Sequence, residues 1–139
     1  MMTCSTTSNE CVFCQIVEGR LPAEVIYEDD SFLAFLDIDP INNGHILIIP
    51  KDHLLDLDAL SEQLITSVFL IAQKLLKRLR RVCPMEGYTI MQNGGLFNDI
   101  GHFHLHLFPR NKSDGFGWVC DESREFTELH KVRALLSNE

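Results

Sequence analysis

Two different spacings of hydrophobic residues divide the chain into helices and strands. Between residues 58 and 82 the apolar side chains recur every three or four positions, which makes one wide apolar face and predicts a long helix. Short apolar runs bounded by Asp, Asn, Gly or Pro predict strands instead. These predicted strands cover residues 24–28, 32–37, 45–49, 87–92 and 101–110. A short helix at 11–18 and a weaker one at 124–136 complete the prediction.

This order of elements is typical of an α+β domain. Strands, a long helix, more strands and a last helix, with short connections, predict an antiparallel sheet of about five strands. The long helix is expected to cover one face of the sheet and to leave the other face free for chemistry. A length of 139 residues fits one domain. Because residues 1–9 are small and polar, we expect a disordered tail there and a single domain over residues 10–139.

Several classes of protein are disfavoured by composition. The longest apolar runs are far shorter than the roughly 20 residues that a membrane helix needs. The N-terminus lacks the basic-then-apolar pattern of a secretion signal, and the five cysteines are an odd number. We therefore expect no membrane association, reduced thiols and a cytoplasmic location.

The charge balance disfavours nucleic acid as a partner. The formal net charge is -8, whereas a nonspecific nucleic-acid binder should be basic because it neutralises phosphates. The basic residues near the end of the long helix, within 74–81, have two interpretations. They form either a nucleic-acid patch or, as we favour, a solvated helix face whose charges complement the helix dipole.

Three of the six histidines fall within five residues, at His102, His104 and His106. Successive side chains of a strand point to opposite faces, so these imidazoles are expected to share one face, with Phe103 and Leu105 on the other. Packing alone does not explain three histidines on one face, although an adventitious metal-binding tract is the remaining alternative. This pattern indicates a catalytic or ligand-binding strand.

Histidines that alternate with apolar residues, followed by two more apolar positions, resemble the histidine triad (HIT) nucleotide-binding family. The stretch from Asp37 to Pro40, and the one from Gly44 to His53, are similar to a second family motif and stand at the family's spacing from the triad. The resemblance covers roughly residues 11–110. It implies a HIT-like fold and a homodimer.

The resemblance also implies a mechanism. His104 corresponds to the nucleophile, which attacks the α-phosphate of a nucleotide and forms a covalent nucleotidyl-histidine that water hydrolyses. A neutral imidazole suits this role near pH 7. His106 is expected to donate to phosphate oxygens or to the leaving group. His45 is expected to orient the nucleophile, although it also fits a structural histidine at the start of a strand.

Further residues are expected to bind the nucleotide. Asp37 matches the family position that binds the ribose hydroxyls, and a carboxylate is a natural acceptor for a diol. Phe35 and Ile38 are expected to wall the base, although core or turn positions explain them equally well. Asn93 and the glycines after it resemble the loop on the phosphate side, where glycine permits close approach of backbone N–H groups to an anion.

The sequence departs from the family pattern just before the triad. Many members have a glutamine four residues before the first triad histidine, with a serine beside it, whereas this chain has Asn98 and Asp99. Asn98 still offers an amide donor on a shorter side chain, and Asp99 is expected to repel a phosphate unless it points away. This departure affects the expected leaving-group preference and rate.

Cys11 and Cys14 stand one helical turn apart, a common half-site for structural zinc. A redox pair and two buried thiols are the alternatives. In zinc-containing HIT proteins of bacterial type, and in the related uridylyltransferases, the site is completed by two histidines. The resemblance implies that these are His53 and His102, which gives a closed Cys2His2 set for a structural Zn²⁺.

The sequence thus predicts a nucleotide hydrolase or nucleotidyl transferase. Nucleoside phosphoramidates and dinucleoside polyphosphates are the expected substrates, with a purine nucleotide as the small-molecule ligand. The alternative is a nucleotide-binding, zinc-structured regulatory module with little or no turnover.

Overall fold

A five-stranded antiparallel sheet forms the centre of the computed structural model, which describes residues 9–137. Its strands are β1 (Val25–Glu28), β2 (Phe32–Leu36), β3 (Ile46–Pro50), β4 (Gly87–Met91) and β5 (Leu105–Arg110), in the order β1-β2-β3-β5-β4. The helices are α1 (Val12–Val17), α2 (Glu62–Val82) and α3 (Leu129–Leu136). The predicted α+β architecture is confirmed. Apart from residue 9, the predicted N-terminal tail lies outside the described residues.

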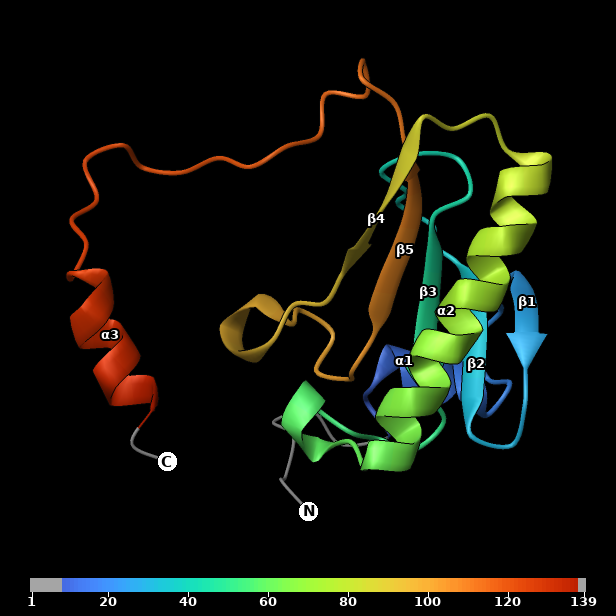
Figure 1. Cartoon of the computed structure of the whole chain (residues 1–139). Coiled ribbons are helices and arrows are strands. Elements are labelled where there is room, and N and C mark those ends of the chain that lie inside the picture. The colour runs from blue at the N-terminus through green and yellow to red at the C-terminus, as the bar shows by residue number, and fades with distance from the viewer. Residues whose placement is uncertain (1–8, 138–139) are drawn as a thin grey trace.

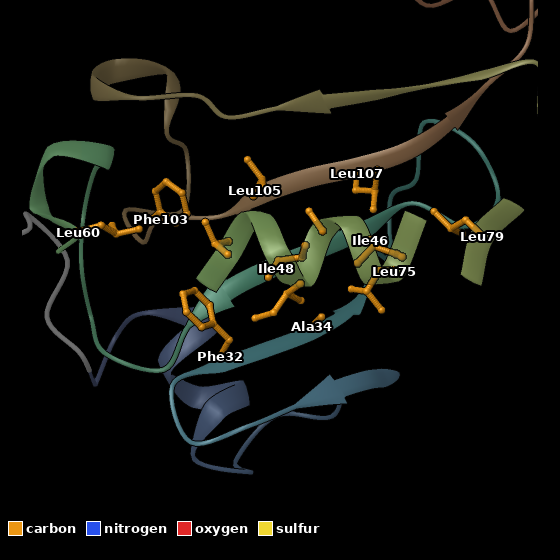
Figure 2. Packing of buried hydrophobic residues seen from close by; sticks show 13 residues of the cluster. Phe32, Ala34, Ile46, Ile48, Leu60, Leu75, Leu79, Phe103, Leu105 and Leu107 are labelled. Carbon is orange, nitrogen blue, oxygen red and sulfur yellow. The ribbon is translucent and has the colours of Figure 1, made fainter. Parts of the chain in front are cut away.

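Helix α2 covers one face of the sheet, as the periodicity predicted (Figure 1). Its buried residues pack on alternate residues of β2, β3 and β5, among them Ala34, Ile48 and Leu107 (Figure 2). Phe103, which precedes β5, joins the same cluster. This layer is the larger of the two apolar clusters and packs against the face of the sheet opposite α1.

The intervening residues of the same strands point to the opposite face. Leu33, Phe35, Leu47 and Ile49 form a second buried cluster with residues of α1. Strands β2 and β3 are therefore buried on both faces, which explains why their sequences are continuously apolar rather than alternating. In the register of β3 and β5, Leu47 stands opposite His106, so that His106 lies on the α1 face.

Strand β5 begins later than predicted. The sequence predicted a strand from residue 101, whereas the ladder with β3 starts at Leu105. The N–H of Phe103 donates to the carbonyl of Leu54 at 2.7 Å, and this bond holds the preceding segment against a loop instead of a neighbouring strand. Local chain geometry at His102 and His104 is thus set by side-chain and loop contacts.

Helix α2 also begins later than the predicted residue 58. Residues Leu57–Ala59 form a short 3-10 turn, and α2 starts at Glu62 because Ser61 caps it. The Ser61 Oγ accepts the N–H of Leu64 at 3.2 Å, the usual way to satisfy a free donor in the first turn.

The C-terminal segment lies apart from the sheet (Figure 1). An extended stretch leads to α3, which begins at Leu129 rather than at the predicted residue 124 and has no buried residue. Within residues 9–137, no helix has both the length and the apolar character needed to cross a bilayer.

Candidate active site

A cavity of about 380 Å³ opens on the α1 face of the sheet, opposite α2. Residues of α1, the end of β2, β3 and the segment leading into β5 line it. The predicted site residues in this lining are Phe35, Asp37, Ile38, Asp99, His104 and His106. Most of the remaining lining is apolar, so that the cavity combines an apolar wall with a few polar groups.

His104 has one ring nitrogen fixed by the backbone and the other one free. Its Nδ1 lies 2.8 Å from the carbonyl oxygen of His102, and the side chain is 4% exposed. Because a carbonyl only accepts, Nδ1 carries the hydrogen and donates it. The Nε2 of the neutral ring then has a free lone pair in a residue that lines the cavity.

His45 and His106 form a second fixed pair. The Nδ1 of His45 accepts the N–H of Ile41 at 3.0 Å, so its hydrogen is on Nε2. That Nε2 is 2.9 Å from Nδ1 of His106, which must accept. The hydrogen of neutral His106 is therefore on Nε2, and this imidazole is a donor where His104 is an acceptor.

Burial keeps His106 and His45 neutral. The pKa of His106 is lowered to about 4, first by burial and then by the neighbouring rings of His104 and His45, against the opposing charges of Asp37 and Asp99. Burial also lowers the pKa of His45, although Asp37 opposes this. The donor and acceptor assignments thus hold at neutral pH.

The end of β2 supplies a polar corner of the cavity. Asp37 accepts the N–H of Asp39 at 2.9 Å, and its other oxygen is 3.6 Å from Nε2 of His45. Ile38 is fully exposed, whereas Phe35 is buried with its ring edge-on to Phe13, 5.5 Å between centroids. Phe35 therefore belongs both to the core and to the cavity wall, which unites the two interpretations that its sequence position left open.

Asn98 and Asn93 have different places from those expected. The Asn98 amide nitrogen donates to the carbonyl of Leu55 at 2.9 Å, and its oxygen accepts the N–H of Gly101 at 3.0 Å. Asn98 is buried and does not line the cavity. Asn93 is also outside the lining, and Asp99, next to Asn98, is exposed at the cavity.

The backbone of the glycine loop after Asn93 already binds a carboxylate, that of Asp56. The N–H of Gly95 donates to Asp56 at 3.2 Å. A side chain at Gly94 would come within 3.0 Å of the same carboxylate. In this structure the glycines bring the loop close to Asp56, an explanation that differs from the expected phosphate cradle.

Beside the cavity, two cysteines and two histidines come together. The ligand atoms of Cys11, Cys14, His53 and His102 all lie within 4.8 Å of one another. Nδ1 of His53 is 3.0 Å from the Cys14 sulfur, and Nδ1 of His102 is 3.4 Å from the Cys11 sulfur. The other nitrogen of His102, Nε2, donates to the carbonyl of Pro50 at 2.8 Å.

This donor set fits a structural zinc ion. Two thiols and two imidazoles are a common closed zinc set, and a backbone acceptor behind a ligating histidine is the usual way to orient it. Burial lowers the pKa of His102 to about 4, so this ring is in the neutral form that binds metals. The four residues that the family resemblance implied do meet at one place.

Sequence reasoning missed three features of the site. Phe13, between the two cysteines, presents its ring edge-on to His104 with 5.2 Å between centroids. Asp39 lines the cavity, and the N–H of Ile41 fixes the tautomer of His45. The position of Phe13 inside the cysteine pair was a usable signal, whereas no sequence pattern marks a backbone N–H.

The lowered pKa of His106 predicts a loss of stability in mild acid. The unfolded chain takes up a proton near pH 6.5 and the folded protein only near pH 4, so stability falls as the pH falls through this window. From pH 7 to pH 5 this one group should remove about 2 kcal/mol from the free energy of unfolding. Urea unfolding at both pH values should therefore show a smaller loss in His106→Asn than in the wild type. Equal losses in the two proteins would contradict the assignment.

Comparison with known proteins agrees with the site. The model of the HIT domain matches residues 18–113. Over 138 residues the chain is 33% identical to an adenosine 5'-monophosphoramidase of Candida albicans, covering 93% of this chain and 90% of that protein.

Solved structures are similar over most of the chain. A HIT family protein from Bacillus anthracis superposes with a TM-score of 0.82 at 33% identity, covering 94% of this chain and 95% of that one. A zinc-bound histidine triad family protein from Mycobacterium smegmatis gives 0.74 at 37% identity, covering 85% and 87%. The triad, the fold and these matches together show that the chain belongs to the HIT domain family.

Proposed function

We propose that this protein hydrolyses nucleotides at the phosphorus next to the nucleoside, through a covalent intermediate on His104. The observation that carries this proposal is the tautomer of His104. Its Nδ1–H is held by the carbonyl of His102, and its Nε2 lone pair belongs to a ring that lines the cavity. The adenosine 5'-monophosphoramidase activity named for the Candida albicans relative supports the same chemistry at phosphorus.

The reaction takes place in two displacements. The Nε2 lone pair of His104 attacks the α-phosphorus, and the bond to the leaving group breaks with its electron pair, so an amine leaves and takes a proton from water. Water then attacks the same phosphorus and gives one proton to the hydroxide left by the first step, the bond to Nε2 breaks with its electron pair returning to His104, and the nucleoside monophosphate leaves. His106 donates its Nε2–H to the phosphate oxygens in both steps without giving up the proton.

Neighbouring residues position these two rings and the substrate. His45 orients His106 through the 2.9 Å hydrogen bond, and we assign it no direct contact with the substrate. Asp37 accepts the ribose hydroxyls, while Phe35 and Ile38 contact a purine base. Asn98 is a positioning residue, because its amide connects Leu55 to Gly101 just before the triad. A role for Asn93 stays a prediction from the resemblance.

A test of the nucleophile separates the enzyme from the alternative module. The wild-type protein should release AMP from adenosine 5'-phosphoramidate, with diadenosine tetraphosphate as a second substrate. His104→Ala should lower the rate by at least about a thousandfold, because the covalent route is lost. His130→Ala, a change at an exposed histidine of α3, serves as the control and should be silent. Tight AMP binding by the wild type without turnover would favour the regulatory module instead.

We further propose that Cys11, Cys14, His53 and His102 bind a structural Zn²⁺. The ion would connect the start of α1 to the segment before β5, and so hold Phe13 against His104. The buried Nε2 of His53 has no hydrogen-bond partner within the described residues, so the polar contact of this ring is the one at its Nδ1, while the ring itself packs edge-on to His102. Thiols that bind zinc must be reduced, which supports the predicted cytoplasmic location.

Metal analysis tests this site directly. Protein purified without added zinc should contain about one equivalent per chain, because the four ligands form a closed set. Cys14→Ser should lose the metal and unfold at a lower temperature, whereas Cys83→Ser, at a cysteine outside the cluster, should keep it. Wild-type protein with reduced thiols and no zinc would refute the proposal.

A homodimer is the third proposal, and an uncovered apolar face supports it. β4 is an edge strand, and beside it α2 exposes Phe69 and Leu70 over a hollow that Tyr88 and Ile90 also line. Unpaired strand edges and apolar patches of this kind are usually covered by a partner. A second copy of this chain would pair with the free edge of β4 and would also cover the apolar patch of α2.

Light scattering on a sizing column tests the dimer. The wild type should have twice the mass of the 15.9 kDa chain. Leu70→Glu should give the monomer, because a charge would be buried at the interface. Lys74→Glu, at an exposed position of the same helix that faces Tyr27 of β1 and lies outside the hollow, should remain dimeric. A monomeric wild type at micromolar concentration would contradict the proposal.

A further inference from the structure

Among the residues that the structure describes, all the charged side chains that line the cavity are acidic. Asp37, Asp39 and Asp99 line it, and no Lys or Arg does. A site for a phosphate group normally contains a cation. A lining with three carboxylates and no Lys or Arg therefore disfavours a substrate that carries several negative charges. Among the described residues that line the cavity, the side chains able to donate a hydrogen bond are the imidazoles of His104 and His106.

Asp99 differs from the other two acids in its place on the chain, because it lies on the segment that leads into the triad and not at the end of β2. At the end of β2, Asp37 lies 3.6 Å from His45 and accepts the backbone N–H of Asp39, whose own carboxylate is exposed. Within residues 9–137, the carboxylate of Asp99 forms no hydrogen bond and no ion pair, and it is exposed. Its charge nevertheless acts on His106, where it opposes the lowering of the pKa by burial. Asp99 lies on the segment that leads into the triad and lines the same cavity as His106, the imidazole that the proposed function assigns to the phosphate oxygens.

The position of Asp99 bears on the leaving group. The proposed function assigns the nucleoside to Phe35, Asp37 and Ile38, whereas Asp99 lines the cavity from a different segment of the chain, next to Ile100. A polyphosphate leaving group would bring several negative charges near this carboxylate. An amine that carries a second, protonated amino group would bring a positive one.

We propose that Asp99 is a specificity residue that favours phosphoramidates whose leaving amine bears an additional positive charge and disfavours anionic leaving groups such as polyphosphates. This inference rests on the proposed function, because it assigns the leaving-group preference of that same reaction. The preference acts through charge rather than shape, since the carboxylate is exposed and free.

Three matched adenosine 5'-phosphoramidates test it. Their leaving amines are 1,5-diaminopentane, hexylamine and 6-aminohexanoate, which have similar chains that end in an ammonium, a methyl and a carboxylate. In the wild type, kcat/KM should fall in that order, with about tenfold between the first and the last at low salt. Raising the ionic strength should reduce this ratio, because exposed charges are screened.

Variants then assign the preference to one carboxylate. Asp99→Asn should bring the three substrates within about twofold of one another, and Asp99→Glu should restore the order. Asp58→Asn, which removes one negative charge outside the cavity, should keep the wild-type order. Equal rates on all three substrates in the wild type, or an unchanged order in Asp99→Asn, would overturn the proposal.

A binding measurement separates this inference from the proposed function. Calorimetry with His104→Asn gives the Kd of each phosphoramidate without a covalent step. If the wild type turns over none of them, the proposed reaction fails, but the order of Kd still tests Asp99. Three equal Kd values, identical in the double variant with Asp99→Asn, would overturn the charge preference on its own.

Discussion

The site depends on a requirement that a buried, neutral imidazole must satisfy: its N–H needs an acceptor. Pro50 and His102 supply these acceptors from the backbone, to His102 and His104 in turn. The carbonyl of His102 is available because the β3–β5 ladder starts only at Leu105 and leaves this residue outside it. Two hydrogen bonds in series thus connect the end of β3 to His104, and they decide which of its nitrogens faces the cavity.

His102 belongs to two structures at once. Its Nδ1 faces the sulfurs of Cys11 and Cys14, while its carbonyl holds His104. Any shift of the ligand cluster therefore moves the residue expected to attack phosphorus, and Phe13 makes a second connection between them. A metal bound at this cluster would act on the proposed reaction through the positions of His102 and Phe13, without contact to the reacting atoms.

The sequence predicted what depends on periodicity and residue type. Helix α2, the five strands and the four clustered ligands follow from spacing or from family resemblance. Of the three histidines predicted to share one face, His104 and His106 line the cavity, whereas His102 lies in the ligand cluster beside it. What it missed depends on backbone groups that no side-chain pattern reveals. The N–H of Phe103 takes the chain out of the sheet, and the loop after Asn93 closes on Asp56. Asn98 was expected to face the substrate, and only the fold shows its amide bonded to Leu55.

The acidic lining of the cavity and the neutral ring of His106 have a common consequence for nucleotide binding. A Lys or Arg in the cavity would attract the negative charge of a nucleotide in the ground state as well as in the transition state, and such uniform binding lowers KM without raising kcat. A neutral N–H on His106 interacts weakly with the ground state and more strongly as negative charge develops on the phosphate oxygens. Asp37 and Asp99 oppose the effect of burial on its pKa, yet burial prevails and the ring stays neutral at pH 7. In the proposed reaction, a lining without Lys or Arg would therefore favour the transition state over the ground state.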